Sequence, residues 1–176
     1  MSRAPLLLPV LATLLLATGA AAEAQQRAQA GASLTVIRSL TVRVEARLRF
    51  GRLNASLAPE PVQVAVEPAP QAGEVDPGQP RRDRTGRSPA IAVVTGDPGR
   101  AYRVLLPREV RTPNGDHLVT RLTVWSANLG DVTRSRTGQL DARGRDVLRI
   151  GGVLTAPEGV EGGVYSAHVP VQIAYE

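Results

Sequence analysis

The fold is decided by a stretch of alternating residues, LTVIRSLTVRVEARLRF, which spans residues 34–50. Every even position in this stretch except Arg38 is apolar, and the odd positions are mostly Thr, Ser, Arg and Glu. Because successive side chains of a β-strand point to opposite faces, the pattern predicts extended chain with one buried and one solvated face. The stretch is much longer than the usual strand of about 5 to 6 residues. We therefore expect two strands, with a break near Arg38 and Ser39.

Further strand patterns follow at short intervals and are separated by turn-forming residues. They cover residues 62–66, 90–95, 101–106, 118–125, 147–154 and 164–175. The breaks contain Asn-Gly and Asp-x-x-Gly sequences, which tolerate the positive φ angles of tight connections. Consecutive strands without helical crossovers predict an all-β, mainly antiparallel fold of about 7–9 strands, arranged as a sandwich or barrel.

The last of these stretches, residues 164–175, gives the sharpest pattern. One face carries Tyr165, Ala167, Val169, Val171, Ile173 and Tyr175. We expect this strand to be structural and buried on that face. Pro170 lacks an N–H group and predicts a sheet edge or a bulge at its position.

The first 24 residues have the three parts of a secretory signal peptide. Arg3 is followed by an apolar core at residues 4–17, and small-x-small sites predict cleavage near Ala22 or Ala24. The sequence then divides into a flexible N-terminal segment, 25–33, and one β-sandwich domain, 34–176. We expect an exported protein of the periplasm, cell surface or extracellular space, without a membrane span once the signal is removed.

The amino-acid composition limits the kinds of site that the chain can form. Cysteine is absent, so no disulfide or thiolate metal site can form. Residues 68–89 are rich in Pro and Gly and predict a long exposed loop. This loop contains the one dense basic cluster, Arg81, Arg82, Arg84 and Arg87, which is either a solvated loop or an anion-binding surface. The other arginines are scattered along strands, and we expect no binding of nucleic acid.

The sequence offers no arrangement for catalysis or metal binding. Its two histidines are His117, in a turn, and His168, which follows Ser166 on the same strand face. A Ser-His-acid triad also requires an orienting acid and an oxyanion hole, and no nucleophile-elbow motif is present. We therefore expect no enzyme activity, no cofactor and no metal.

From residue 34 onward, six segments in order resemble a family of exported bacterial proteins known as domain of unknown function 4402. They are LRFGRL at 48–53, AVVTGDPGRAY at 92–102, LLP at 105–107, GQLDARG at 138–144, IGGVL at 150–154 and GVYS at 163–166. Ala92 replaces a usual aromatic residue and Ala167 replaces a usual glycine. The resemblance implies an immunoglobulin-like β-sandwich without known enzyme activity, similar to pilin or fimbrial subunits.

Two functional hypotheses follow. The first is a surface-structural, pilus-like subunit in which residues 25–40 add a strand to the exposed sheet edge of a neighbour, with a periplasmic chaperone as a further partner. Pairing of the same segment within its own domain is the alternative. The second hypothesis is an envelope-associated module that binds an anionic glycan or other acidic polymer through Arg81, Arg82, Arg84 and Arg87.

Overall fold

The computed structural model describes residues 36–53, 61–70, 76, 78–79, 82–113, 118–158 and 161–176, which belong to one unit, Val36–Glu176. The expected signal peptide, its cleavage near Ala22 or Ala24 and the segment 25–33 lie outside the described residues. Arg81 and His117 also lie outside them. No helix in the described part of the chain is long and apolar enough to span a membrane.

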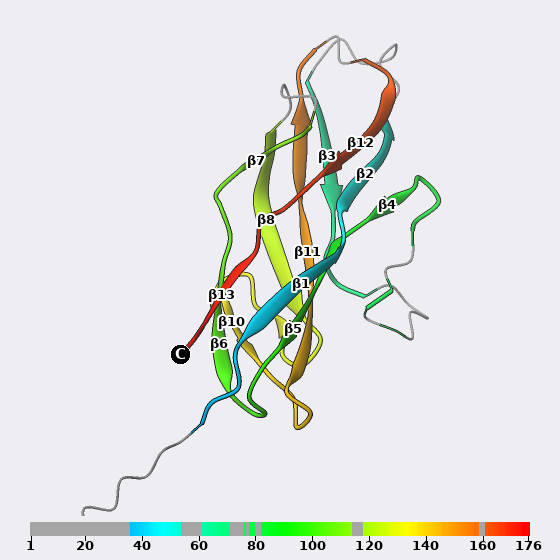
Figure 1. The fold of residues 1–176 in the computed structure, drawn as a ribbon. Helices are drawn as coiled ribbons and strands as arrows, with labels where there is room; N and C mark the ends of the chain where they lie inside the picture. Colours follow the sequence, from blue (N-terminus) through cyan, green and yellow to red (C-terminus); the bar gives the residue numbers. More distant parts are fainter. Residues whose placement is uncertain are drawn as a thin grey trace, which may run out of the picture. The chain divides into compact units, whose positions relative to one another are not determined.

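The described residues form an all-β sandwich, as the alternation predicts (Figure 1). The larger sheet contains, in spatial order, β1 (Thr41–Ala46), β5 (Ala90–Thr95), β11 (Arg145–Ala156), β8 (Leu118–Ser126) and β7 (Val110–Arg111). Two more strands extend it: β3 (Val62–Val66) pairs with β11, and β9 (Gly130–Asp131) pairs with β8.

Two three-stranded sheets pack against the larger sheet. One has the order β12 (Gly163–Ala167), β2 (Leu48–Leu53) and β4 (Arg87–Ser88). The other has the order β10 (Thr137–Gln139), β6 (Ala101–Leu105) and β13 (Gln172–Tyr175). Every pair of strands described is antiparallel. The strands that the sequence patterns did not indicate are the short ones, β4, β7, β9 and β10.

The first alternating stretch forms two strands, but the break predicted near Arg38 and Ser39 is wrong. Residues 36–40 belong to no strand, and β1 and β2 are separated at Arg47. The register of β1 against β5 shifts between Val44 and Ala46, and β2 then pairs with β12 in the other layer. A shift of this kind bends a strand, so the chain changes layer without losing its alternation.

The last alternating stretch, expected as one strand with an edge or a bulge at Pro170, is instead divided into two strands, and Pro170 lies between them. β12 ends at Ala167 and pairs with β2, whereas β13 begins at Gln172 and pairs with β6. Between them the chain passes from one three-stranded sheet to the other. Tyr165 and Val169 are buried as expected, but Val171, Ile173 and Tyr175 are only half-buried.

The interior consists of two apolar clusters. The first lies between the larger sheet and the β12–β2–β4 sheet, and it includes Phe50, Leu154 and Tyr165. The second lies between the larger sheet and the β10–β6–β13 sheet, and it includes Val124 and Leu148.

The loop at 68–89 is less exposed than its composition predicts. Pro68 is buried, and its carbonyl oxygen accepts a hydrogen bond from Nε of Arg149 at 2.8 Å. Arg149 is 1% exposed, so this start of the loop covers the outer face of β11. The end of the loop forms β4. The cause is tertiary: long-range contacts with β11 and β2 order parts of a segment whose local sequence favours no regular structure.

Candidate functional site

A carboxylate, that of Asp146, is buried inside the sandwich. Oδ2 of Asp146 accepts hydrogen bonds from the hydroxyls of Tyr102 and Ser126, both at 2.7 Å, and Oδ1 accepts one from the N–H of Val147 at 2.7 Å. Burial raises the pKa of Asp146, although the hydrogen bonds from Ser126 and Tyr102 oppose it. Burial, followed by the charge of Asp146, raises the pKa of Tyr102. The Asp146 carboxylate and its two hydroxyl partners are enclosed, and we interpret them as structural.

Sequence reasoning missed this carboxylate, although a signal was present. In β11, Asp146 has the same parity as Leu148, Ile150 and Leu154, all of which are buried. An acidic residue in the core register of a strand predicts a satisfied buried carboxylate, because an unpaired one would cost several kcal/mol.

The three loop arginines that the structure describes, Arg82, Arg84 and Arg87, do not share one exposed surface. Arg82 and Arg84 are exposed, but Arg87 lies in β4, half-buried, and its Nε is enclosed without a hydrogen-bond partner. Oδ1 of Asp83 accepts hydrogen bonds from the N–H groups of Thr85 and Arg87, both at 2.8 Å. Burial alone would raise the pKa of Asp83, but hydrogen bonds from Thr85 and Arg87 outweigh it and lower the pKa. Arg87 therefore belongs to an ordered turn and strand.

Ser166 and His168 share the outer face of the β12 segment, half-buried and exposed respectively. The strands of this sheet, β12, β2 and β4, contain no Asp or Glu. Within the described residues, no group of three His, Cys, Asp or Glu side chains could hold a metal ion.

A different site emerges at β13, which has an unpaired edge. The N–H of Glu176 donates to the carbonyl of Ala101 at 3.2 Å, in register with the pairing of Tyr175 with Tyr102. In an antiparallel pair, successive residues direct their N–H and C=O groups alternately toward and away from the partner strand. The backbone groups of Ile173 and Tyr175 therefore point away from β6. No other strand in the described part of the chain pairs with them.

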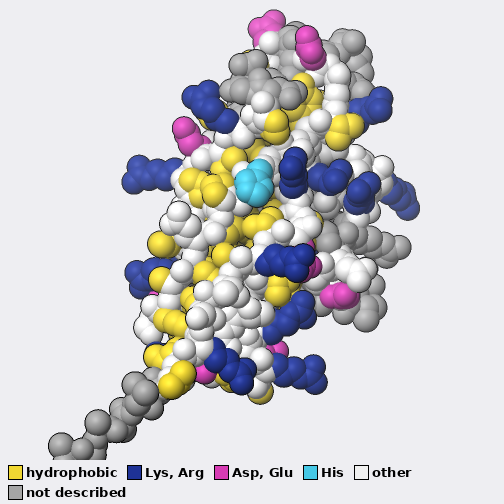
Figure 2. Space-filling model, viewed as in Figure 1, with side chains coloured by type: hydrophobic (Ala, Val, Ile, Leu, Met, Phe, Trp, Pro, Cys, Tyr) yellow, Lys and Arg dark blue, Asp and Glu magenta, His cyan; other side chains and the backbone are white. Residues whose placement is uncertain are grey.

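The free edge of β13 lies beside β1, which has β5 as its single partner among the described strands. Half-buried apolar side chains border the space between the two strands. They are Leu40, Val42 and Val44 on one side and Val171, Ile173 and Tyr175 on the other. Figure 2 shows hydrophobic side chains in a band across this face of the molecule. We call these six residues the β1–β13 strip.

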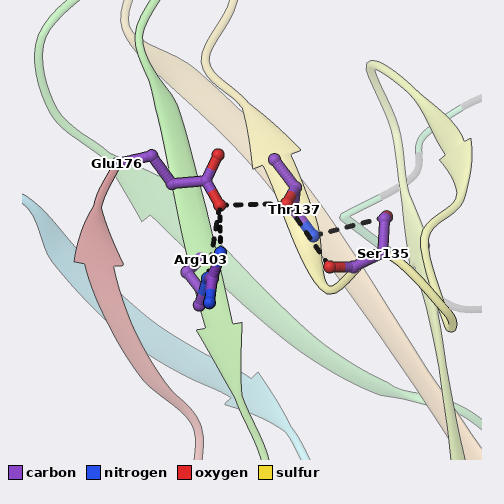
Figure 3. Close-up of polar contacts among 4 residues, drawn as sticks. All are labelled: Arg103, Ser135, Thr137 and Glu176. Atoms are coloured by element: carbon purple, nitrogen blue, oxygen red, sulfur yellow. Dashed lines mark hydrogen bonds and ion pairs between the residues drawn. The ribbon is translucent and has the colours of Figure 1, made fainter.

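The C-terminal end of β13 is fixed by contacts to neighbouring segments. The Tyr175 hydroxyl accepts a hydrogen bond from the N–H of Asp97 at 2.6 Å and donates one to the carbonyl of Arg38 at 2.8 Å. Oε1 of Glu176 accepts hydrogen bonds from Nη2 of Arg103 and Oγ1 of Thr137, both at 3.1 Å (Figure 3). These contacts hold β13 in the sheet while its outer edge stays open.

Comparison with known proteins identifies the family. The model of the family described as domain of unknown function (DUF4402) matches residues 40–175. The chain belongs to this family. The match spans this DUF4402 domain from the residue before β1 to the end of β13. No curated protein and no solved structure matches the chain.

Proposed function

We propose that this DUF4402 protein is an exported, non-enzymatic structural subunit of the bacterial surface, comparable to a pilus subunit. In this proposal, subunits associate when a β-strand from one copy pairs with the free edge of β13 in the next. The observation that carries the proposal is this unpaired edge beside the half-exposed β1–β13 strip. The signal pattern of residues 1–24 supports export.

β13 carries none of the side chains that usually prevent strand addition. Natural sheets protect their edges with charged side chains, proline, bulges or covering segments. The sequence of β13 is QIAY, which contains no charge and no proline. A strand added there would gain main-chain hydrogen bonds, and its alternate side chains would cover the apolar strip. We infer that a periplasmic chaperone would have to protect the same edge before assembly.

The N-terminal segment supplies a suitable donor sequence. Even positions from 28 to 36 are all apolar, namely Ala28, Ala30, Ala32, Leu34 and Val36. Arg38 and Leu40 already contact their own domain, because the Arg38 carbonyl accepts a hydrogen bond from Tyr175 and Leu40 packs against the second apolar cluster. We therefore narrow the donor from residues 25–40 to about 25–36, which is long enough to supply one added strand. Val36 is 79% exposed and Ile37 is 44% exposed.

The test is the oligomeric state of the mature protein, measured by size-exclusion chromatography with light scattering and by electron microscopy. We expect the mature chain to form oligomers and a variant without residues 25–33 to be monomeric. A synthetic peptide of residues 25–36 should bind that truncated variant. A mature chain that is monomeric, together with no binding of the peptide, would refute the proposal.

A matched pair of variants locates the interaction at the β13 edge. Ile173→Pro removes an N–H that points away from β6, so it should block strand addition while the β6–β13 hydrogen bonds remain. Ile173→Ala removes nearly the same side chain but keeps the N–H. Association should be lost in I173P and only weakened in I173A, with both variants folded by circular dichroism. Equal association of the two variants would place the interface elsewhere.

A further inference from the structure

A basic surface covers the outer face of β2. Leu48, Phe50 and Leu53 point into the core and are buried. The arginines that flank these residues point outward: Arg47, just before β2, and Arg52 are exposed, and Arg49 is half-buried. Gly51, with a φ of +76°, and the register shift opposite Tyr165 bring Arg52 back to the outer face after Phe50.

The neighbouring strand β12 places polar side chains beside these arginines. Arg52 pairs with Val164 and Arg49 pairs with Ser166, and residues directly opposite in a ladder share a face. His168 continues the same alternation beyond the end of β12 and is exposed. We call Arg47, Arg49, Arg52, Ser166 and His168 the β2 basic face. It combines three guanidinium groups with a hydroxyl and an imidazole.

Nothing in the described part of the chain neutralises this face. None of Arg47, Arg49 and Arg52 forms an ion pair with a described residue, whereas Arg103 on the β10–β6–β13 sheet is paired with Glu176 at 3.1 Å. The strands β2, β4 and β12 contain no acidic residue. Figure 2 shows basic side chains near the exposed histidine on this part of the molecule. Unpaired like charges gathered on one face produce a positive potential that attracts anionic ligands.

We propose that the β2 basic face binds a linear acidic polysaccharide, with its guanidinium groups on carboxylate or sulfate groups and Ser166 and His168 on sugar hydroxyls. Arg donates two parallel hydrogen bonds to such planar or tetrahedral anions. In extended chain the Cα atoms of alternate residues lie about 7 Å apart, so successive outward side chains can meet charges repeated along an extended polymer. This site is separate from the β13 edge. The proposal places anion binding on β2 and β12 and not on the loop at 68–89, where the sequence led us to expect it.

The composition of the face favours a polysaccharide over nucleic acid or a bilayer. Binding of single-stranded nucleic acid uses exposed aromatic rings for base stacking, but Phe50, Tyr102 and Tyr165 are buried. Insertion into a membrane interface requires a large apolar face, and Val164 is the one large apolar side chain exposed on β12.

The test uses the full mature protein and immobilised heparin and alginate as sulfated and carboxylated probes. We expect binding at low ionic strength and its loss at about 0.5 M salt, where screening shortens the range of these charges to a few ångströms. The variant R47S/R49S/R52S should bind roughly tenfold more weakly, since each exposed contact contributes a factor of about two or slightly more. The variant R47K/R49K/R52K, which keeps the charge, should bind within a few-fold of the wild type.

The matched control is R121S/R134S/R143S, which removes the same charge from β8 and from two turns. It should bind as the wild type does, because Arg121, Arg134 and Arg143 lie outside the β2 basic face. Equal weakening in the two serine variants would show that net charge alone drives binding and would overturn the proposal. Tighter binding to duplex DNA or to anionic phosphatidylglycerol vesicles than to either polysaccharide would also overturn it.

Discussion

Tyr102 and Asp146 show how one buried hydrogen-bonded group is held by residues from three strands. Tyr102 comes from β6, Ser126 from β8 and Asp146 from β11, and all three side chains are buried. Gly138 of β10 lies against the Tyr102 ring, where an added Cβ would be 2.8 Å from Cε1. A glycine is therefore required there to let the ring reach the carboxylate. The group links the two layers inside the second core cluster.

The variant Tyr102→Phe should destabilise the fold in a pH-dependent way. Losing the hydroxyl removes a donor that opposes the raised pKa of Asp146, so that pKa should rise further. Below the unfolded-state pKa near 3.8, Asp146 is neutral in both states and its contribution to stability is fully present. As the pH rises through the folded-state pKa, ionisation of the enclosed group removes this contribution. We expect a loss of about 1–2 kcal/mol at pH 7 and a smaller loss at pH 3.

Urea unfolding of wild type and Y102F at the two pH values measures this difference. Tyr175→Phe is the control, because the Tyr175 hydroxyl contacts only the backbone groups of Asp97 and Arg38. Its stability loss should be the same at both pH values. Equal losses at pH 3 and pH 7 for Y102F would contradict the role assigned to Asp146.

At the scale of elements, each of the two long alternating stretches supplies one strand to each of two different sheets. Residues 41–53 pass from β5 of the larger sheet to β12 of the opposite layer. Residues 163–175 pass from β2 to β6. Where β2 and β12 pair, the two stretches meet in one sheet, of which β12 is an edge strand. Where the chains diverge into β1 and β13, two edges remain without partners among the described strands.

Tyr175 should fix the start of β1 as well as the end of β13. Its hydroxyl contacts Arg38, three residues before β1, and its ring lies beneath Arg100 at 5.1 Å. In Y175F we expect faster amide hydrogen exchange in β1 and a stability loss of about 1–2 kcal/mol. The control Thr41→Val removes the exposed contact between the Thr41 and Thr95 hydroxyls at 2.7 Å and should change exchange little. Unchanged exchange in β1 of Y175F would refute the anchoring role.

At the scale of the whole molecule, packing rather than cross-linking stabilises the fold. The chain has no cysteine, and the ion pair between Arg103 and Glu176 lies at the surface. An exposed pair of this kind contributes at most about 1 kcal/mol. The two apolar clusters share partly buried neighbours, Leu106 and Val171, and β11 passes through both. They should therefore unfold together.

Leu154→Ala tests this cooperativity. Leu154 is fully buried in the first cluster, so the substitution should cost about 2–5 kcal/mol. Trp125 reports on the other end of the sandwich, since it neighbours Val124 of the second cluster. Its fluorescence transition should move to lower denaturant together with the far-ultraviolet circular dichroism transition. A Trp125 transition that stays in place would show that the two clusters unfold independently.

The sequence by itself determined which side chains share a face. The strand patterns placed Val62–Val66 and Ala90–Thr95 with the bounds that the structure has. These features depend on the alternation of side chains along a single strand, which is set by that strand's own residues.

Only the tertiary structure decided which strands pair, and hence where the candidate sites lie. Contacts between distant segments determine four features that the sequence did not predict. They are the layer change at Arg47, the covering of β11 by Pro68, the free edge of β13 and the β2 basic face. Alternation specifies the faces of a strand but not its partner, because pairing is set by long-range register and packing.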